Sequence, residues 1–176
     1  MGPRSRPVLT PEKRRLVATA AARRVLEPPW REICAIFEAA GYDAPGRAKF
    51  TVTTDVREGC RHFAATTGDE VMFAPQMVDL PFDSCAGIMA HEAGHVVDLT
   101  APCRYWWQGG ELVEAHVVDP PSRLIGRWNA RPHDDVERIA DAIAMMVVGV
   151  KIGYVGSPGC VVQALGRGRR RPKDLR

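Results

Sequence analysis

Two histidines with a glutamate between them form the part of the sequence best suited to chemistry, His91-Glu92-Ala93-Gly94-His95. In a helix, residues four apart project from the same face, so His91 and His95 can chelate one metal ion. Glu92 is displaced around the helix axis from that face, where it can accept a proton from a metal-bound water. The apolar residues on both sides favour a half-buried helix over a solvated one. The segment therefore predicts a zinc site with Glu92 as the general base.

A catalytic zinc ion usually takes three protein ligands and a water molecule, so a third ligand is needed. Asp98 and Ala101 stand where the metzincin pattern requires glycine and histidine, which excludes that class. Glu137 and Asp141 lie one turn apart on a later predicted helix. Together they offer a carboxylate ligand and a carboxylate that could hold a histidine ring nitrogen. The spacing from Asp134 to Glu137 also fits a capping box, which is the competing structural interpretation.

The two segments HEAGH at 91–95 and ERIAD at 137–141 resemble the gluzincin metallopeptidases. More narrowly, they are similar to the small ImmA/IrrE-type peptidases of bacteria and their mobile elements. The resemblance covers about residues 70–150, and the insertion between its two helices is longer than that pattern. It implies that the strand around Val71-Met72-Phe73 is an edge that pairs with an extended peptide. The resemblance also implies that His91, His95 and Glu137 bind zinc. It implies Glu92 as the general base and Asp141 as the carboxylate behind His91.

His116 is the rival third ligand, because SprT-like peptidases, which act near DNA, use a histidine downstream of HExxH. His133 and His62 are weaker candidates for that position. Peptide hydrolysis also needs a hydrogen-bond donor for the developing oxyanion, and the residues that could serve are Tyr105, His116, His133 and Tyr154.

The leading hypothesis is a zinc-dependent endopeptidase that holds one catalytic ion and acts on protein or peptide substrates. The alternative is a regulatory or binding module that retains the metal, DNA-associated and SprT-like if His116 is the ligand.

The elements that must position these residues follow from hydrophobic periodicity and turn signals. We expect helices at 11–26, with Thr10 as the N-cap, and at 30–40, 83–99 and 134–150, the first ending before Pro28-Pro29. We expect strands near 50–54, 61–65, 70–74 and 111–118, with a hairpin turn at 66–69. This order indicates an α+β, minimal zincin-like fold. In it, a small and mostly antiparallel sheet packs on the HExxH helix and on the C-terminal ligand-bearing helix, and the N-terminal helices precede both.

Charge divides the chain into an acidic body and two basic ends. Residues 1–24 carry seven Lys/Arg and one acid, and residues 167–176 carry six and one, so 25–166 have 11 basic and 19 acidic residues. We therefore expect a basic N-terminal helical segment (1–26), a zincin-like domain (27–166) and a basic tail (167–176). The basic ends make nucleic acid a candidate partner.

The sequence also gives expectations about location. No apolar run approaches the roughly 20 residues that span a bilayer, and no signal peptide is visible. The five cysteines include no C-x-x-C pair. Reduced thiols and a cytoplasmic location are the expectation.

Overall fold

The computed structural model describes residues 10–54, 63–152 and 162–164, which form an α+β fold as predicted. Its helices are α1 (Pro11–Ala39), α2 (Ala44–Arg47), α3 (Phe82–Thr100), α4 (Ser122–Asn129) and α5 (His133–Val148), with a 3-10 helix η1 (Pro75–Asp79). Its strands are β1 (Lys49–Val52), β2 (Ala64–Thr67), β3 (Glu70–Phe73), β4 (Tyr105–Gln108), β5 (Glu111–Glu114), β6 (Val150–Ile152) and β7 (Val162–Ala164). No helix among these residues is long and apolar enough to cross a membrane.

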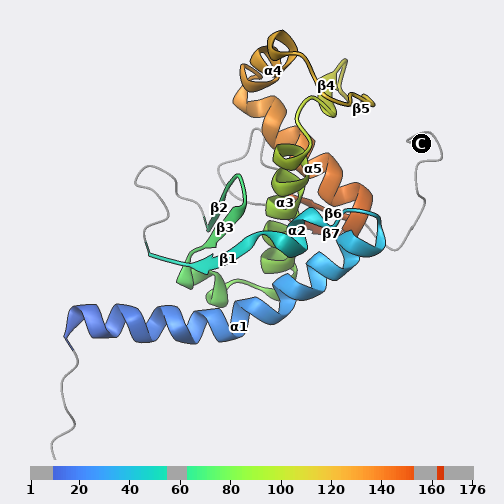
Figure 1. Ribbon diagram of the computed structural model, residues 1–176. Coiled ribbons are helices and arrows are strands. Elements are labelled where there is room, and N and C mark those ends of the chain that lie inside the picture. Colours follow the sequence, from blue (N-terminus) through green and yellow to red (C-terminus); the bar gives the residue numbers. More distant parts are fainter. Residues whose placement is uncertain (1–9, 55–62, 153–161, 165–176) are drawn as a thin grey trace, which may run out of the picture.

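Helix α1 is continuous where the sequence predicted two helices separated by Pro28-Pro29. Both prolines lie inside it, and the helix changes direction along its length (Figure 1). Each proline removes one hydrogen-bond donor from the helix, which normally breaks or kinks it. However, Leu26 and Trp30 on either side of the prolines are both buried in the same core. This shared burial offsets the lost bonds, so the predicted boundary at residue 26 falls inside one element.

The three-stranded sheet has the order β1-β3-β2 and is mixed, whereas the β4–β5 and β6–β7 pairs are antiparallel, so strand pairing is mostly antiparallel as expected from sequence. Strand β2 pairs with β3 in an antiparallel hairpin through the predicted turn, where Gly68 has a φ of +59°. Strand β1 pairs with the other side of β3 in parallel. The prediction that the strand around Val71–Phe73 is an edge is therefore wrong, because a period-2 pattern does not specify which strands flank it. Strand β2 is the outer strand on that side.

Helices α3 and α5 run antiparallel and side by side, and the β2–β3 hairpin lies next to α3 on its other side (Figure 1). Gly94 lies at their closest approach. A Cβ added there would overlap the carbonyl oxygen of Ala140 and lie 3.0 Å from its Cα. Small residues at these two positions are therefore what allows the two helices to approach this closely. On the other side of the core, Trp30 of α1 packs against Phe73 of β3, with ring centroids 5.4 Å apart.

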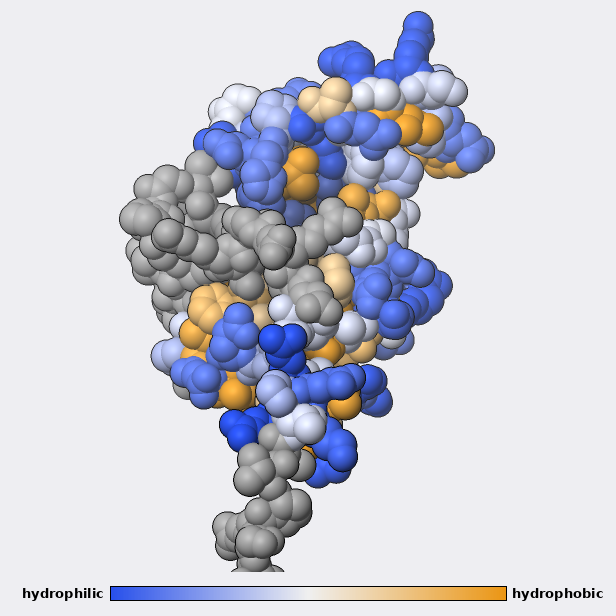
Figure 2. Space-filling model, turned by 90° about the vertical axis from the view of Figure 1, so that its left-hand side faces the viewer, coloured by the Kyte–Doolittle hydropathy of each residue, from blue (hydrophilic) through white to orange (hydrophobic). Residues whose placement is uncertain are grey.

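The segment between α3 and α5 forms the β4–β5 hairpin and helix α4. These elements gather beyond the C-terminal end of α3 (Figure 1). The predicted strand at 111–118 is shorter than expected and ends at Glu114. Hydrophilic residues cover most of the upper part of the face in Figure 2, with a few exposed apolar residues among them. The insertion is thus a surface substructure at one end of the α3–α5 pair.

Candidate metal centre

Three side chains from two helices converge between α3 and α5. They are His91 and His95 of α3 and Glu137 of α5, and their potential ligand atoms all lie within 4.8 Å of one another. The two imidazole rings are perpendicular, with centroids 4.6 Å apart. Glu137 spans them, with one carboxylate oxygen 3.0 Å from His91 Nε2 and the other 3.5 Å from His95 Nε2. The arrangement is suited to holding one metal ion.

The other ring nitrogen of His91 is occupied by Asp141. Its carboxylate lies 2.8 Å from Nδ1, and both side chains are buried. With Nδ1 donating to this carboxylate, Nε2 is directed at the ligand group. Burial lowers the pKa of His91, but the hydrogen bonds to Asp141 and Glu137 outweigh it and raise that pKa to about 10. Without a metal, His91 therefore carries a proton in the position that an ion would take.

The contacts with the two histidines also lower the pKa of Glu137. Its burial works to raise the pKa, but the hydrogen bonds to His91 and His95 dominate and hold it well below its ordinary value. The carboxylate is thus ionised across the neutral pH range. Two imidazoles and one carboxylate are the donor set of a common class of catalytic metal sites, so the residues present fit a bound divalent ion.

Glu92 is buried on the side of α3 that faces the sheet, with 4% of its surface exposed. Its carboxylate oxygen Oε2 accepts a hydrogen bond from Thr66 Oγ1 of β2 at 2.7 Å. Glu92 is therefore held against β2, while its neighbours His91 and His95 turn towards α5. This places a buried carboxylate beside the ligand group without making it one of the group.

A buried ion pair joins the C-terminal part of α3 to the start of α5. Arg131 contacts both oxygens of Asp98, at 3.1 and 2.6 Å. It also donates to the carbonyl oxygens of Trp128 and Tyr105. The guanidinium lies over the Trp128 ring, 4.1 Å from the ring centroid. Because Arg131 comes two residues before α5 begins, this cluster fixes where the helix carrying Glu137 starts relative to α3.

The other sequence candidates lie in different places. His133 is exposed, but its Nδ1 is 3.5 Å from a Glu137 oxygen. His116 is exposed in the loop after β5, and Tyr105 is buried with its hydroxyl 3.4 Å from that of Tyr42. Neither belongs to the ligand group found among the described residues. The candidates outside the described ranges are His62, Tyr154 and the tail at 167–176.

Sequence reasoning missed two contributors to the site. Thr66 lies in a short strand 26 residues before Glu92, and nothing in its local pattern indicates that contact. Asp98 lies one helical turn after His95 on the same mostly apolar helix. An acid buried there needs a charged partner, and that partner is Arg131.

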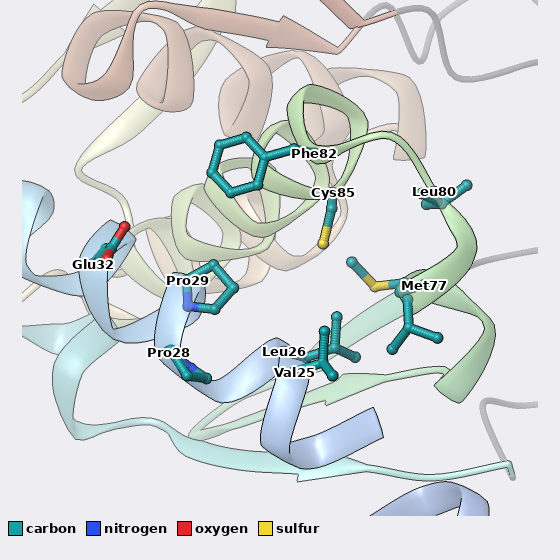
Figure 3. Close-up of a pocket in the computed structure, with 10 residues that line it drawn as sticks. Val25, Leu26, Pro28, Pro29, Glu32, Met77, Leu80, Phe82 and Cys85 are labelled. Carbon is teal, nitrogen blue, oxygen red and sulfur yellow. The ribbon is translucent and has the colours of Figure 1, made fainter. Parts of the chain in front are cut away.

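A separate hollow of about 320 Å³ lies at the N-terminal end of α3, away from the ligand group (Figure 3). It is mostly apolar and is lined by Pro28 and Pro29 of α1, Met77 and Leu80, and Phe82 and Cys85 of α3, while Glu32 adds a charged group to the lining. Both prolines of α1 form part of its wall (Figure 3). None of the three ligand residues takes part in it.

Comparison with known proteins gave no match to a family model, to a curated protein or to a solved structure.

Proposed function

We propose that this protein is a zinc-dependent endopeptidase. The observation that carries the proposal is the ligand group of His91, His95 and Glu137 together with Glu92, a buried acid next to His91 in the chain whose charge acts to raise the pKa of His91. A purely structural zinc site is normally closed by four protein ligands, whereas catalytic sites take three and leave one position open. Three protein ligands next to a carboxylate that is not a ligand fit the catalytic type.

Zinc, when bound, would polarise a peptide carbonyl and make a water molecule more acidic. Glu92 accepts a proton from the attacking water as its oxygen forms a bond to the carbonyl carbon. Glu92 then passes that proton to the amide nitrogen as the carbon–nitrogen bond breaks, so the carboxylate returns to its starting state. Asp141 keeps the His91 ring in the tautomer and orientation that direct Nε2 at the ligand group.

Strand β2 is the natural partner for an extended substrate. Among the described residues it pairs with β3 on one side only, and Thr66 places it next to Glu92. An extended peptide can add to such an edge through main-chain hydrogen bonds. This pairing would lay a peptide bond along the sheet side of α3, close to the base.

The experiment combines metal analysis with proteolysis. Purified protein is stripped with a chelator and reloaded with zinc, and each form is incubated with a denatured protein whose new termini are mapped. Glu92→Gln should keep its zinc and lose cleavage by about 10² to 10⁴-fold. Glu111→Gln on the exposed part of β5 is the matched control and should cleave like the wild type.

Cleavage that survives both metal removal and Glu92→Gln would overturn the proposal. Zinc binding without cleavage of any peptide would favour the alternative function instead, a metal-retaining regulatory module that works through partner contacts. That alternative no longer needs His116 as a ligand, since Glu137 occupies the third position in the group.

A further inference from the structure

The hydrogen bond between Thr66 and Glu92 joins the general base to the sheet. At 2.7 Å, it has the length expected for a hydroxyl donating to a carboxylate. The same hydroxyl oxygen lies farther from the Glu92 carbonyl oxygen, at 3.4 Å, so the carboxylate is the closer acceptor. A carboxylate rotates easily about its terminal bond, and a single short donor restricts that rotation.

The backbone of Thr66 faces away from β3. Ala74 donates to the carbonyl oxygen of Phe63 at 2.7 Å, which makes these two residues a hydrogen-bonded pair at the start of the β2–β3 ladder. Such pairs alternate along antiparallel strands. In the observed register, Thr66 lies opposite Val71 at a non-hydrogen-bonded position. Its N–H and C=O groups therefore point to the outer edge of the sheet.

We propose that Thr66 is a positioning residue that links peptide binding at the β2 edge to the orientation of Glu92. This inference rests on the proposed function. One residue carries both contacts: its main chain faces the edge where an extended peptide would pair, and its side chain holds the base. A peptide that pairs with β2 restrains the backbone of Thr66 and, through its hydroxyl, the Glu92 carboxylate that must accept the proton.

The competing explanation is that Thr66 only satisfies a buried carboxylate, as any hydroxyl can. The two explanations differ in their effect on turnover. A merely structural contact changes stability. A positioning contact changes the rate of the chemical step while the affinity for substrate stays the same.

The structure provides a matched control on the neighbouring strand. Thr51 of β1 donates to the carboxylate of Glu70 at 2.6 Å, which is the same chemistry on a half-buried strand of the same sheet. Thr51→Val therefore removes a threonine–glutamate hydrogen bond that has no link to the ligand group. Its cleavage rate should equal that of the wild type.

The test compares Thr66→Val and Thr66→Ser in full-length, metal-loaded protein. Thr66→Val should lower kcat by about 10 to 100-fold, the range seen for supporting partners of metal sites, with KM within about two-fold. Thr66→Ser keeps the hydroxyl and should restore kcat to within a few-fold of the wild type. If the valine variant does not fold, Thr66→Ala replaces it.

A second readout does not depend on cleavage. The absorption spectrum of the Co²⁺-loaded protein should change in Thr66→Val and return in Thr66→Ser, because the carboxylate beside the ion is reoriented. An unchanged spectrum, a kcat within two-fold of the wild type, or a loss confined to KM would each overturn the inference.

The inference and the proposed function can fail separately. If the wild type cleaves, Glu92→Gln does not, and Thr66→Val equals the wild type, only the inference fails. If the wild type does not cleave, the endopeptidase proposal fails, and the Co²⁺ spectra still decide whether Thr66 positions Glu92. If the protein binds no Co²⁺ at all, both fall.

Discussion

Replacing Gly94 with alanine tests whether the close packing of α3 on α5 creates the metal centre. The added Cβ would overlap the carbonyl oxygen of Ala140, so the two helices would have to separate locally by about 0.6 to 1 Å to restore an allowed contact. Metal sites tolerate errors of only about 0.2 Å in ligand distances. Ala140 lies one turn from Glu137 on the same helix, so this shift would carry the carboxylate away from both histidines. Zinc affinity should fall by about 10-fold or more.

The expected change in stability has two opposing parts. Alanine is favoured over glycine inside a helix by about 1 kcal/mol. Overpacking a close-packed contact costs about 1–3 kcal/mol. The free energy of unfolding of the metal-free protein should therefore fall by up to about 2 kcal/mol, although the substitution favours the helix itself.

The assay measures zinc affinity by chelator competition and stability by urea unfolding of the metal-free protein. Gly126→Ala on α4 is the matched control, because a Cβ at this helical glycine would meet nothing within 4 Å. That variant should be slightly more stable and bind zinc normally. If Gly94→Ala behaves like this control in both assays, the contact with Ala140 does not set the ligand geometry and the reasoning is refuted.

Three further predictions concern the ligand set, the protonation of His91 and the C-terminal tail. Glu137→Ala should lose zinc almost completely, Asp141→Ala should bind it about 10 to 100-fold more weakly, and His116→Ala should bind it normally. Chelator competition at one pH measures all three affinities. If His116 were the ligand, His116→Ala would lose zinc and Glu137→Ala would bind it normally. Because the pKa of metal-free His91 is raised to about 10, that ring is protonated at pH 8. At pH 8, zinc binding should therefore release about one proton, and zinc affinity should rise as the pH increases towards 10. Calorimetry in two buffers of different ionisation enthalpy measures the released protons, and finding none would contradict this prediction. Removing residues 167–176 should weaken retention on heparin in a salt-dependent way, and unchanged elution would end the nucleic-acid proposal for that segment.

Hydrophobic spacing and turn residues correctly predicted those helices and turns of this protein that depend on a single continuous segment. The helices carrying His91 and Glu137 were predicted within two residues of their observed ends, because an apolar stripe at helical spacing is a local property. The hairpin at 66–69 was predicted for a similar reason, since its turn residues are adjacent. The same rules failed at Pro28, where burial on both sides of the prolines outweighed the local preference to end the helix.

The sequence by itself determined the chemical types of the ligand group and the helical spacing that puts His91 and His95 on one face. Only the tertiary structure decided which distant residues complete the site. Glu137 reaches the histidines because Gly94 and Ala140 allow α3 and α5 to touch, and Thr66 reaches Glu92 because β2 is the outer strand beside β3. These contacts join residues 26 to 46 positions apart. They depend on packing and strand order, which no periodicity within a single element records.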